Sequence, residues 1–182
     1  MCAARWTLLH ASSMIGHDIV DLRAAKMESD PLRGGWAKKV LSEPEQAWAA
    51  KSDDPATLCW RLWAAKEAAY KAHIRCGGKP GLYPYRIFCD PENQTALIER
   101  QRYFLKWEAS DAKIMAFAAG SSDILAQIIA VPPSKIIKIN DLPYAKCPTG
   151  WKPASVSHHG IYHEAVTLED EAWFLISGTP DQ

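Results

Sequence analysis

The chain has 182 residues, of which 48% are hydrophobic, so it is long enough for a single domain with a real core. Its 21 basic and 21 acidic residues balance, so no overall field points to nucleic acid or to a membrane surface as a partner. The five cysteines form no C-x-x-C pair and are odd in number, so neither a disulfide framework nor a zinc site follows. Reduced thiols in a cytoplasmic protein are the simplest interpretation.

Residues 1–13 are expected to be an N-terminal extension, followed by one domain over residues 14–182. The extension is too short and too weakly apolar for a convincing signal peptide or membrane span. Met14 directly precedes the first clear strand and is an alternative start of translation.

The first predicted element is a short buried strand over Met14–Leu22, with Asp18 near its middle. Aspartate is disfavoured in strands, and a carboxylate among Ile15, Ile19 and Val20 is costly unless it is paired or bound to a cation. A turn or cap position fits poorly, because apolar residues follow the aspartate at once. Asp18 is therefore a candidate functional residue, although this stretch alone does not decide between the two interpretations.

The next segment, residues 23–39, is basic and is interrupted by Pro31 and by Gly34–Gly35, so we expect a loop. Its cations could meet phosphates, but a solvated surface is their more usual fate. A helix should follow from Ser42, the N-cap of a capping box that Glu45 completes.

The central predicted helix includes Trp60–Arg75, is opened by Ser52–Pro55 and is closed by Gly77–Gly78. One apolar stripe on it consists of Leu58, Leu62, Ala65, Ala69 and Ala72. Three of these five residues are alanine, so another element can approach closely there. A second stripe carries Trp63, Glu67 and Lys71, which places the carboxylate and the ammonium on one face. By itself, such a Glu–Lys pair is usually an ordinary solvated pair worth a few tenths of a kcal/mol.

The second half of the chain is predicted to be rich in strands. The expected strands are Tyr85–Cys89, Thr95–Trp107, Ala112–Ala119, Ala154–Ser157, Tyr162–Leu168 and Glu171–Ile176. Ile124–Val131 is ambiguous between strand and short helix. Pro132–Lys152 contains four prolines and is expected to be a surface excursion with a short Ile136–Ile139 strand.

Three histidines, His158, His159 and His163, lie within six residues near the end of the chain. Their spacing matches no dependable metal motif, so zinc is the weaker interpretation. A histidine that donates to a phosphate is the better functional interpretation, and a loop histidine without a role is the alternative.

Three stretches stand in a fixed order: G-H-D-I-V-D-L at Gly16–Leu22, R-L-W-A-A-K-E-A-A-Y-K-A at Arg61–Ala72, and S-V-S-H-H at Ser155–His159. Together they resemble the motifs of the 4′-phosphopantetheinyl transferase superfamily, of which the middle one is long and specific. The separation between the acidic motifs fits as well. The segment between residues 93 and 151 has no counterpart in this resemblance and is expected to be an insertion.

The resemblance implies an α+β fold in which the long helix packs across an antiparallel sheet. It implies transfer of the phosphopantetheine arm of coenzyme A to a serine of an acyl or peptidyl carrier protein, with release of adenosine 3′,5′-bisphosphate. Asp18 and Glu67 would supply the carboxylates for Mg²⁺, with Glu67 accepting the serine proton. Lys71 would contact the pyrophosphate. The resemblance places further phosphate contacts at Arg61, Lys66 and His158.

The carrier protein is expected to be an acidic helical partner that docks on a local basic and aromatic patch. The position of the Ser-His motif after the acidic motifs is similar to that in small trimeric holo-acyl-carrier-protein synthases. In these enzymes the Ser-His strand of one subunit completes the site of its neighbour. A homo-oligomer, and specifically a trimer, is therefore expected.

Three residues depart from the motifs. Val20 stands two residues after Asp18, where the two-lobed branch of the superfamily has a second acid, and Asp21 comes one residue later. His17 replaces an apolar residue beside Asp18, where it would either lower the pKa of that carboxyl group or point outward. His159 follows His158 where a small residue is usual, so either histidine could face the nucleotide.

Two other functions stay open. A non-catalytic coenzyme A- or carrier-binding module of the same fold would lack magnesium-dependent turnover. A structural protein with an ordinary K-E-A-A-Y-K helix would lose nothing measurable in Glu67→Ala.

Overall fold

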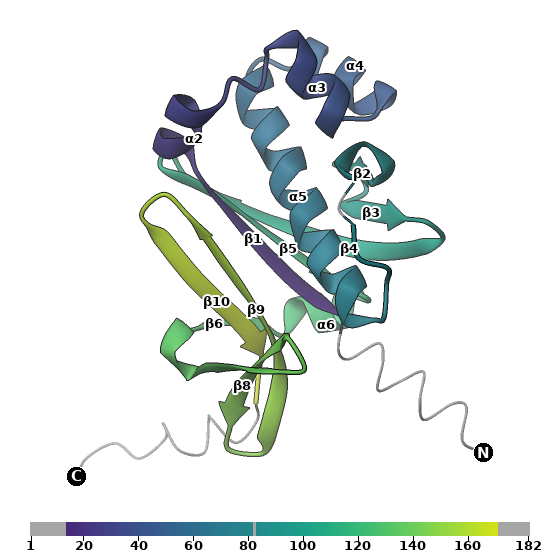
Figure 1. The fold of residues 1–182 in the computed structure, drawn as a ribbon. Helices are drawn as coiled ribbons and strands as arrows, with labels where there is room; N and C mark the ends of the chain where they lie inside the picture. The colour runs from purple at the N-terminus through teal and green to yellow at the C-terminus, as the bar shows by residue number, and fades with distance from the viewer. Residues whose placement is uncertain (1–13, 82, 171–182) are drawn as a thin grey trace.

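The computed structural model describes residues 14–81 and 83–170. The expected N-terminal extension and the expected strand at Glu171–Ile176 lie outside these residues. The described residues form two five-stranded sheets, with strand orders β1-β5-β4-β3-β2 and β6-β10-β9-β8-β7, and every strand pair in them is antiparallel. The long helix α5 lies across the first sheet (Figure 1), so the α+β arrangement is confirmed.

The helices are α2 (Leu22–Glu28), α3 (Gly34–Val40), α4 (Glu43–Lys51), α5 (Pro55–Arg75) and α6 (Ser122–Ala126), with short 3-10 turns η1 (Pro84–Arg86) and η2 (Pro133–Lys135). The strands of the first sheet are β1 (Ile15–Asp21), β2 (Phe88–Asp90), β3 (Thr95–Ile98), β4 (Gln101–Ala109) and β5 (Lys113–Ala119). Those of the second are β6 (Ile128–Val131), β7 (Ile136–Ile139), β8 (Leu142–Cys147), β9 (Gly150–His159) and β10 (Tyr162–Leu168). Over the described ranges, no helix combines the length and apolarity needed to cross a membrane.

Helix α5 begins at Pro55, within the Ser52–Pro55 segment expected to open it and ahead of the Trp60–Arg75 stretch. The side chain of Asp54 caps it by accepting a hydrogen bond from the backbone N of Thr57 (3.0 Å), and Pro55 occupies the first turn. The helix ends at Arg75 as predicted, and Gly77 follows with a left-handed φ of 83°.

The predicted alanine stripe packs against β1. Ala65, Ala69 and Ala72 are fully buried, and the strand comes so close that a Cβ on Gly16 would lie 1.9 Å from the carbonyl oxygen of Ala68. Only glycine fits at this crossing. The two backbones are thus in direct contact, which fixes β1 relative to α5.

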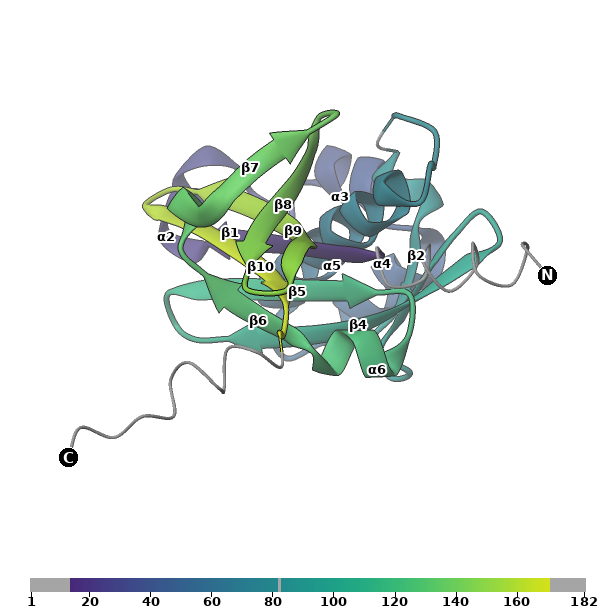
Figure 2. The same cartoon turned by 90° about the horizontal axis from the view of Figure 1, so that it is seen from below.

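The two sheets meet along the edge of β1 that does not pair with β5. Figure 2 shows β9 and β10 beside β1, although β1 pairs through its backbone with β5. Backbone N–H groups of β1 donate to side chains of β9 instead, and we call these three bonds the side-chain ladder. They run from His17 N to Ser155 Oγ (2.9 Å), from Ile19 N to Ser157 Oγ (3.3 Å) and from Asp21 N to His159 Nδ1 (2.8 Å).

Four predictions about local structure were wrong. The strand expected at Tyr85–Cys89 begins only at Phe88, because Pro84–Arg86 form the 3-10 turn η1. The loop expected at residues 23–39 contains α2 and α3, because Asp21 caps α2 by accepting from Arg23 N (2.9 Å) and Ala24 N (3.1 Å). The single strand expected at Thr95–Trp107 is divided into β3 and β4 at a turn where Glu99 has a positive φ of 55°. The expected surface excursion after Val131 contributes β7, β8 and the start of β9 to the second sheet.

Other predictions were confirmed. The capping box of Ser42 and Glu45 is present at the start of α4, and Ile136–Ile139 forms β7. The ambiguous segment at Ile124–Val131 contains both alternatives, because the end of α6 and the whole of β6 lie within it.

Candidate functional site

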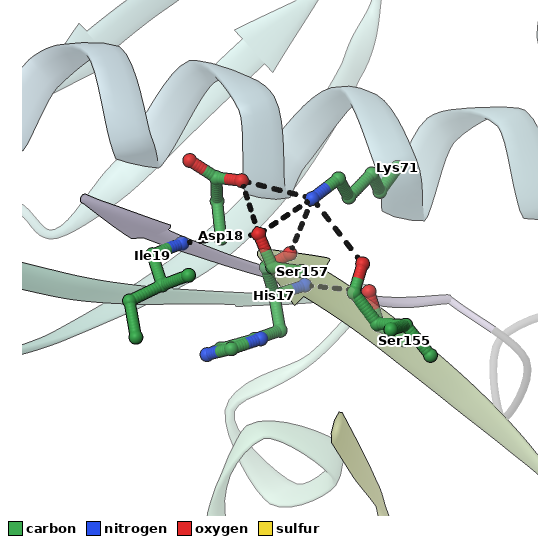
Figure 3. Close-up of polar contacts among 7 residues, drawn as sticks. His17, Asp18, Ile19, Lys71, Ser155 and Ser157 are labelled. Carbon is green, nitrogen blue, oxygen red and sulfur yellow. Dashed lines mark hydrogen bonds and ion pairs between the residues drawn. The ribbon is translucent and has the colours of Figure 1, made fainter. Parts of the chain in front are cut away.

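Asp18 is held in the middle of β1 by two donors. It is 7% exposed, and its Oδ1 accepts hydrogen bonds from Lys71 Nζ (2.8 Å) and from Ser157 Oγ (2.7 Å). Figure 3 shows these side chains converging from β1, α5 and β9. The buried carboxylate is therefore paired, as its position in an apolar strand requires.

Lys71 ties the three elements together. Besides Asp18, its Nζ donates to the backbone oxygen of His17 (2.9 Å) and to Ser157 Oγ (3.2 Å), and it lies 3.5 Å from the backbone oxygen of Val156. Its side chain is 30% exposed, so Lys71 is only partly enclosed by the protein. A charge placed in this way can meet an incoming anion.

Glu67 lies one helical turn before Lys71 and is half-buried. Among the described residues, its carboxylate makes no hydrogen bond and no ion pair. Burial and the nearby charge of Asp18 raise the pKa of Glu67 to about 7, against a smaller opposing effect of Lys71. Such a carboxylate changes its protonation state close to neutral pH, as a general base must.

The carboxylates of Asp18 and Glu67 form a suitable donor pair for a divalent cation. A cation between them would relieve the repulsion that raises the pKa of Glu67, and Mg²⁺ is commonly bound by one or two carboxylates together with waters and phosphate oxygens. No cluster of three or more histidine, cysteine or acidic side chains suited to a metal occurs in residues 14–81 and 83–170. The site thus offers two protein ligands, which leaves room for oxygens from a phosphate substrate.

Lys66 is placed differently from the expectation that it binds a phosphate. It is fully buried, and its Nζ donates to Glu45 Oε2 (2.7 Å), to the backbone oxygen of Pro84 (2.9 Å) and to that of Ile87. All three protons of the ammonium group are used, so Lys66 fastens α5 to the start of α4 and to the segment before β2.

Arg61 and His158 are exposed, and among the described residues neither is joined to Asp18 or Lys71 by a hydrogen bond or an ion pair. The guanidinium group of Arg61 lies 5.6 Å from the ring centre of Trp107, and the ring of His158 lies 6.4 Å from that of His163. The structure therefore brings together three of the predicted site residues, Asp18, Glu67 and Lys71, and leaves Arg61 and His158 outside this cluster.

Sequence reasoning missed Ser157 and left His159 undecided. Because side chains alternate along a strand, Ser155, Ser157 and His159 all point from β9 toward β1. His159 also lies 3.3 Å from a carboxylate oxygen of Glu28 through its Nε2. The alternation of polar residues in S-V-S-H-H was the available signal, and it favours His159 over His158 as the histidine facing β1.

His17 is fully buried, so it does not point outward. Its ring packs 5.1 Å from that of Phe117, and neither ring nitrogen has a hydrogen-bond partner within the described part of the chain. Burial lowers the pKa of His17 to about 3, with smaller contributions from Lys71 and Lys113. The ring is neutral at physiological pH and supplies no charge that could act on Asp18.

Comparison with known proteins relates this chain to one family. A 40% identical relative is the holo-[acyl-carrier-protein] synthase of Vesicomyosocius okutanii subsp. Calyptogena okutanii (strain HA), aligned over 58 residues, or 32% of this chain. The alignment spans 46% of that relative, so the chain covers about half the length of the curated protein it matches.

Two solved structures are also similar. The holo-[acyl-carrier-protein] synthase from Neisseria meningitidis has a TM-score of 0.48 at 20% identity and aligns over 58% of this chain and 95% of its own. The holo-ACP-synthase from Plasmodium yoelii has a TM-score of 0.43 at 22% identity, over 58% of this chain and 91% of its own.

The sequence pattern of the 4′-phosphopantetheinyl transferase superfamily matches residues 14–125, which is more than half of the chain. The match includes Asp18, Glu67 and Lys71, and it ends before β9. The chain therefore belongs to the 4′-phosphopantetheinyl transferase superfamily.

Proposed function

We propose that this protein transfers the 4′-phosphopantetheine arm of coenzyme A to a serine hydroxyl of an acyl or peptidyl carrier protein. The observation that carries the proposal is the cluster of Asp18, Glu67 and Lys71, which joins two carboxylates and an ammonium group at a half-open site. Phosphoryl transfer needs positioning and neutralisation of charge more than covalent help from the protein, and these groups supply both.

In the proposed reaction, the serine oxygen forms a bond to the phosphorus atom that carries the pantetheine arm. The bond from that phosphorus to the bridging oxygen breaks, and adenosine 3′,5′-bisphosphate leaves. Glu67 takes the serine proton, since its carboxylate lies one helical turn from Lys71 on the same face of α5. Lys71 stabilises negative charge on the pyrophosphate, held in position by Asp18 and Ser157.

Asp18 and Glu67 would hold Mg²⁺ in this proposal. The ion, when bound, would neutralise charge on the phosphate oxygens. Ser157 keeps Asp18 oriented toward α5 through its 2.7 Å hydrogen bond. Mg²⁺ dependence is thus part of the proposal and is tested together with it.

A hollow of about 600 Å³ beyond the end of β1 is suited to the carrier protein. Arg23 and Lys26 of α2 line it together with two strongly exposed apolar residues, Met27 (83%) and Ile161 (86%). Two acids, Asp21 and Asp111, also line the hollow, so the exposed apolar side chains beside the cations of α2 are the part that would receive an acidic helical partner. The hollow also includes Asp21, three residues beyond Asp18, so a bound carrier would lie near the carboxylates.

The test is intact-protein mass spectrometry of an apo carrier protein incubated with this protein, coenzyme A and Mg²⁺. Wild type should add one phosphopantetheine arm, and EDTA should abolish the addition. Glu67→Ala should lose at least a hundredfold in rate, whereas Glu92→Ala, at an exposed glutamate, should not.

Other outcomes would contradict the proposal. Retained coenzyme A binding without transfer to any of several carrier proteins would indicate a binding module. Equal rates for wild type and Glu67→Ala would remove Glu67 from the mechanism.

A further inference from the structure

A second hollow, of about 560 Å³, lies between α5 and the β7–β8 hairpin. Its apolar lining includes Tyr70, Ile74, Ile136, Ile137 and Leu142. The volume is in the range of small-molecule sites, roughly 300–1,000 Å³. Lys71 also lines this hollow, so it opens directly beside the Asp18–Lys71 pair.

The hollow arises where β8 separates from β9. The pairing of β8 with β9 ends at Pro153, whereas β10 stays paired with β9 up to His159. The separation leaves part of one edge of β9 facing α5, and two cations of α5 lie along it. Arg75 donates to the backbone oxygen of Ala154 (3.2 Å), and Lys71 lies 3.5 Å from that of Val156.

The charges around the hollow favour a neutral ligand. Lys71 is bonded to Asp18, and Arg75 donates to two backbone oxygens, those of Pro143 (2.9 Å) and Ala154. The remaining cation that lines the hollow, Lys138, is exposed and shares the lining with an acid, Asp141. Lys71 is shared with the Asp18 site and can meet a phosphate there. A further phosphate within the hollow would need additional uncommitted donors, whereas an uncharged chain needs apolar contact and amide partners.

Strand β7 offers such amide partners. It is the edge strand of its sheet and pairs with β8 on one side. Three consecutive residues, Ile136, Ile137 and Lys138, line the hollow, and side chains alternate along a strand. Because neighbouring side chains point to opposite faces, the backbone of β7 itself borders the hollow. Among the described residues, the outer edge of β7 pairs with no further strand, which leaves N–H and C=O groups for a ligand.

We propose that this hollow binds the pantetheine arm of coenzyme A, with its amides along the open edge of β7 and its nucleotide outside the hollow. The arm is uncharged, extended and rich in methylene and methyl groups, and its phosphate end would lie at Lys71. The inference rests on the proposed function and adds the part of the substrate that this site takes. Strands β7 and β8 lie outside residues 14–125, so the family match does not include this wall.

The test uses two tryptophan substitutions on β7. Ile137 lines the hollow and Ile139 does not, and the two are similarly exposed, at 43% and 39%. Ile137→Trp should raise the Kd for coenzyme A and for 4′-phosphopantetheine at least tenfold and leave the Kd for adenosine 3′,5′-bisphosphate unchanged. Ile139→Trp should leave all three constants unchanged, as measured by calorimetry on variants whose melting temperatures match wild type.

Two results would overturn the inference. Equal weakening of coenzyme A and adenosine 3′,5′-bisphosphate by Ile137→Trp would assign the hollow to the nucleotide. Normal transfer and binding by Ile137→Trp would show that the hollow takes neither part, while the proposed function would stand. Absence of both transfer and coenzyme A binding in wild type would instead remove the proposed function itself.

Discussion

At the scale of single residues, Glu67 is held in surroundings that disfavour its charge. Its pKa is raised from 4.5 to about 7 by burial and by Asp18, so the fold disfavours the ionised carboxylate. The pKa of Glu67 in the folded protein thus lies above its pKa in the unfolded chain. Protonated Glu67 therefore makes its full contribution to the free energy of unfolding below about pH 4.5, and this contribution is lost as pH rises through about 7.

Glu67→Gln should consequently stabilise the protein at high pH. We expect the free energy of unfolding to rise by about 1–2 kcal/mol at pH 8, after reduction for solvent screening, and to stay unchanged near pH 4.5. Denaturant unfolding at both pH values, without divalent metal, measures this. Glu92→Gln is the control at an exposed position. A variant as stable as wild type at pH 8 would show that the fold does not disfavour the ionised carboxylate of Glu67.

Lys66 shows why a residue adjacent to a site residue in sequence can lie away from the site in the structure. Lys66 and Glu67 are adjacent in the K-E motif, but adjacent residues on a helix point about 100° apart. Glu67 faces the side shared with Lys71, while Lys66 turns into the protein to meet Glu45. The pattern located the helix correctly, but the partner of Lys66 lies in α4, which no local spacing reveals.

At the scale of elements, the side-chain ladder between β1 and β9 can be tested bond by bond. Ser155→Ala and Ser157→Ala each leave a buried backbone N–H without an acceptor, so each should cost about 1–3 kcal/mol in stability. Ser157 additionally touches Asp18 and Lys71. Ser157→Ala should therefore lower kcat about tenfold more than Ser155→Ala does.

Unfolding curves and transfer kinetics on the two serine variants measure this difference. Equal losses of kcat would mean that Ser157 supports only the joint between the sheets and does not position Asp18.

Elements defined by local signals were predictable from the sequence. The buried strand with Asp18, the capping box and the end of α5 all depend on neighbouring residues, and the structure has them where expected. Helix α3 was missed because Gly34 and Gly35 suggested a loop, yet they form its first turn. The contact between β1 and β9 could not be predicted from local sequence either, because it joins residues 138 positions apart.

At the scale of the whole molecule, the Ser-His strand completes the site of its own chain. Ser157 of β9 bonds to Asp18 of β1 within one polypeptide. The expected homotrimer stays a prediction, but this contact does not require a neighbour. Specific activity should therefore stay constant on dilution across the concentration at which light scattering detects dissociation. A fall in specific activity that follows dissociation would show that a second copy supplies part of the site.

The contact between Gly16 and Ala68 has a consequence for how this protein can change over time. Because the main chains of β1 and α5 touch there, the separation between the two carboxylate-bearing elements is set by atoms common to every amino acid. Substitutions elsewhere in the core can repack without shifting that separation. Any larger residue at position 16 would clash with the backbone of Ala68. This glycine therefore keeps the distance between β1 and α5 constant while other core residues are substituted.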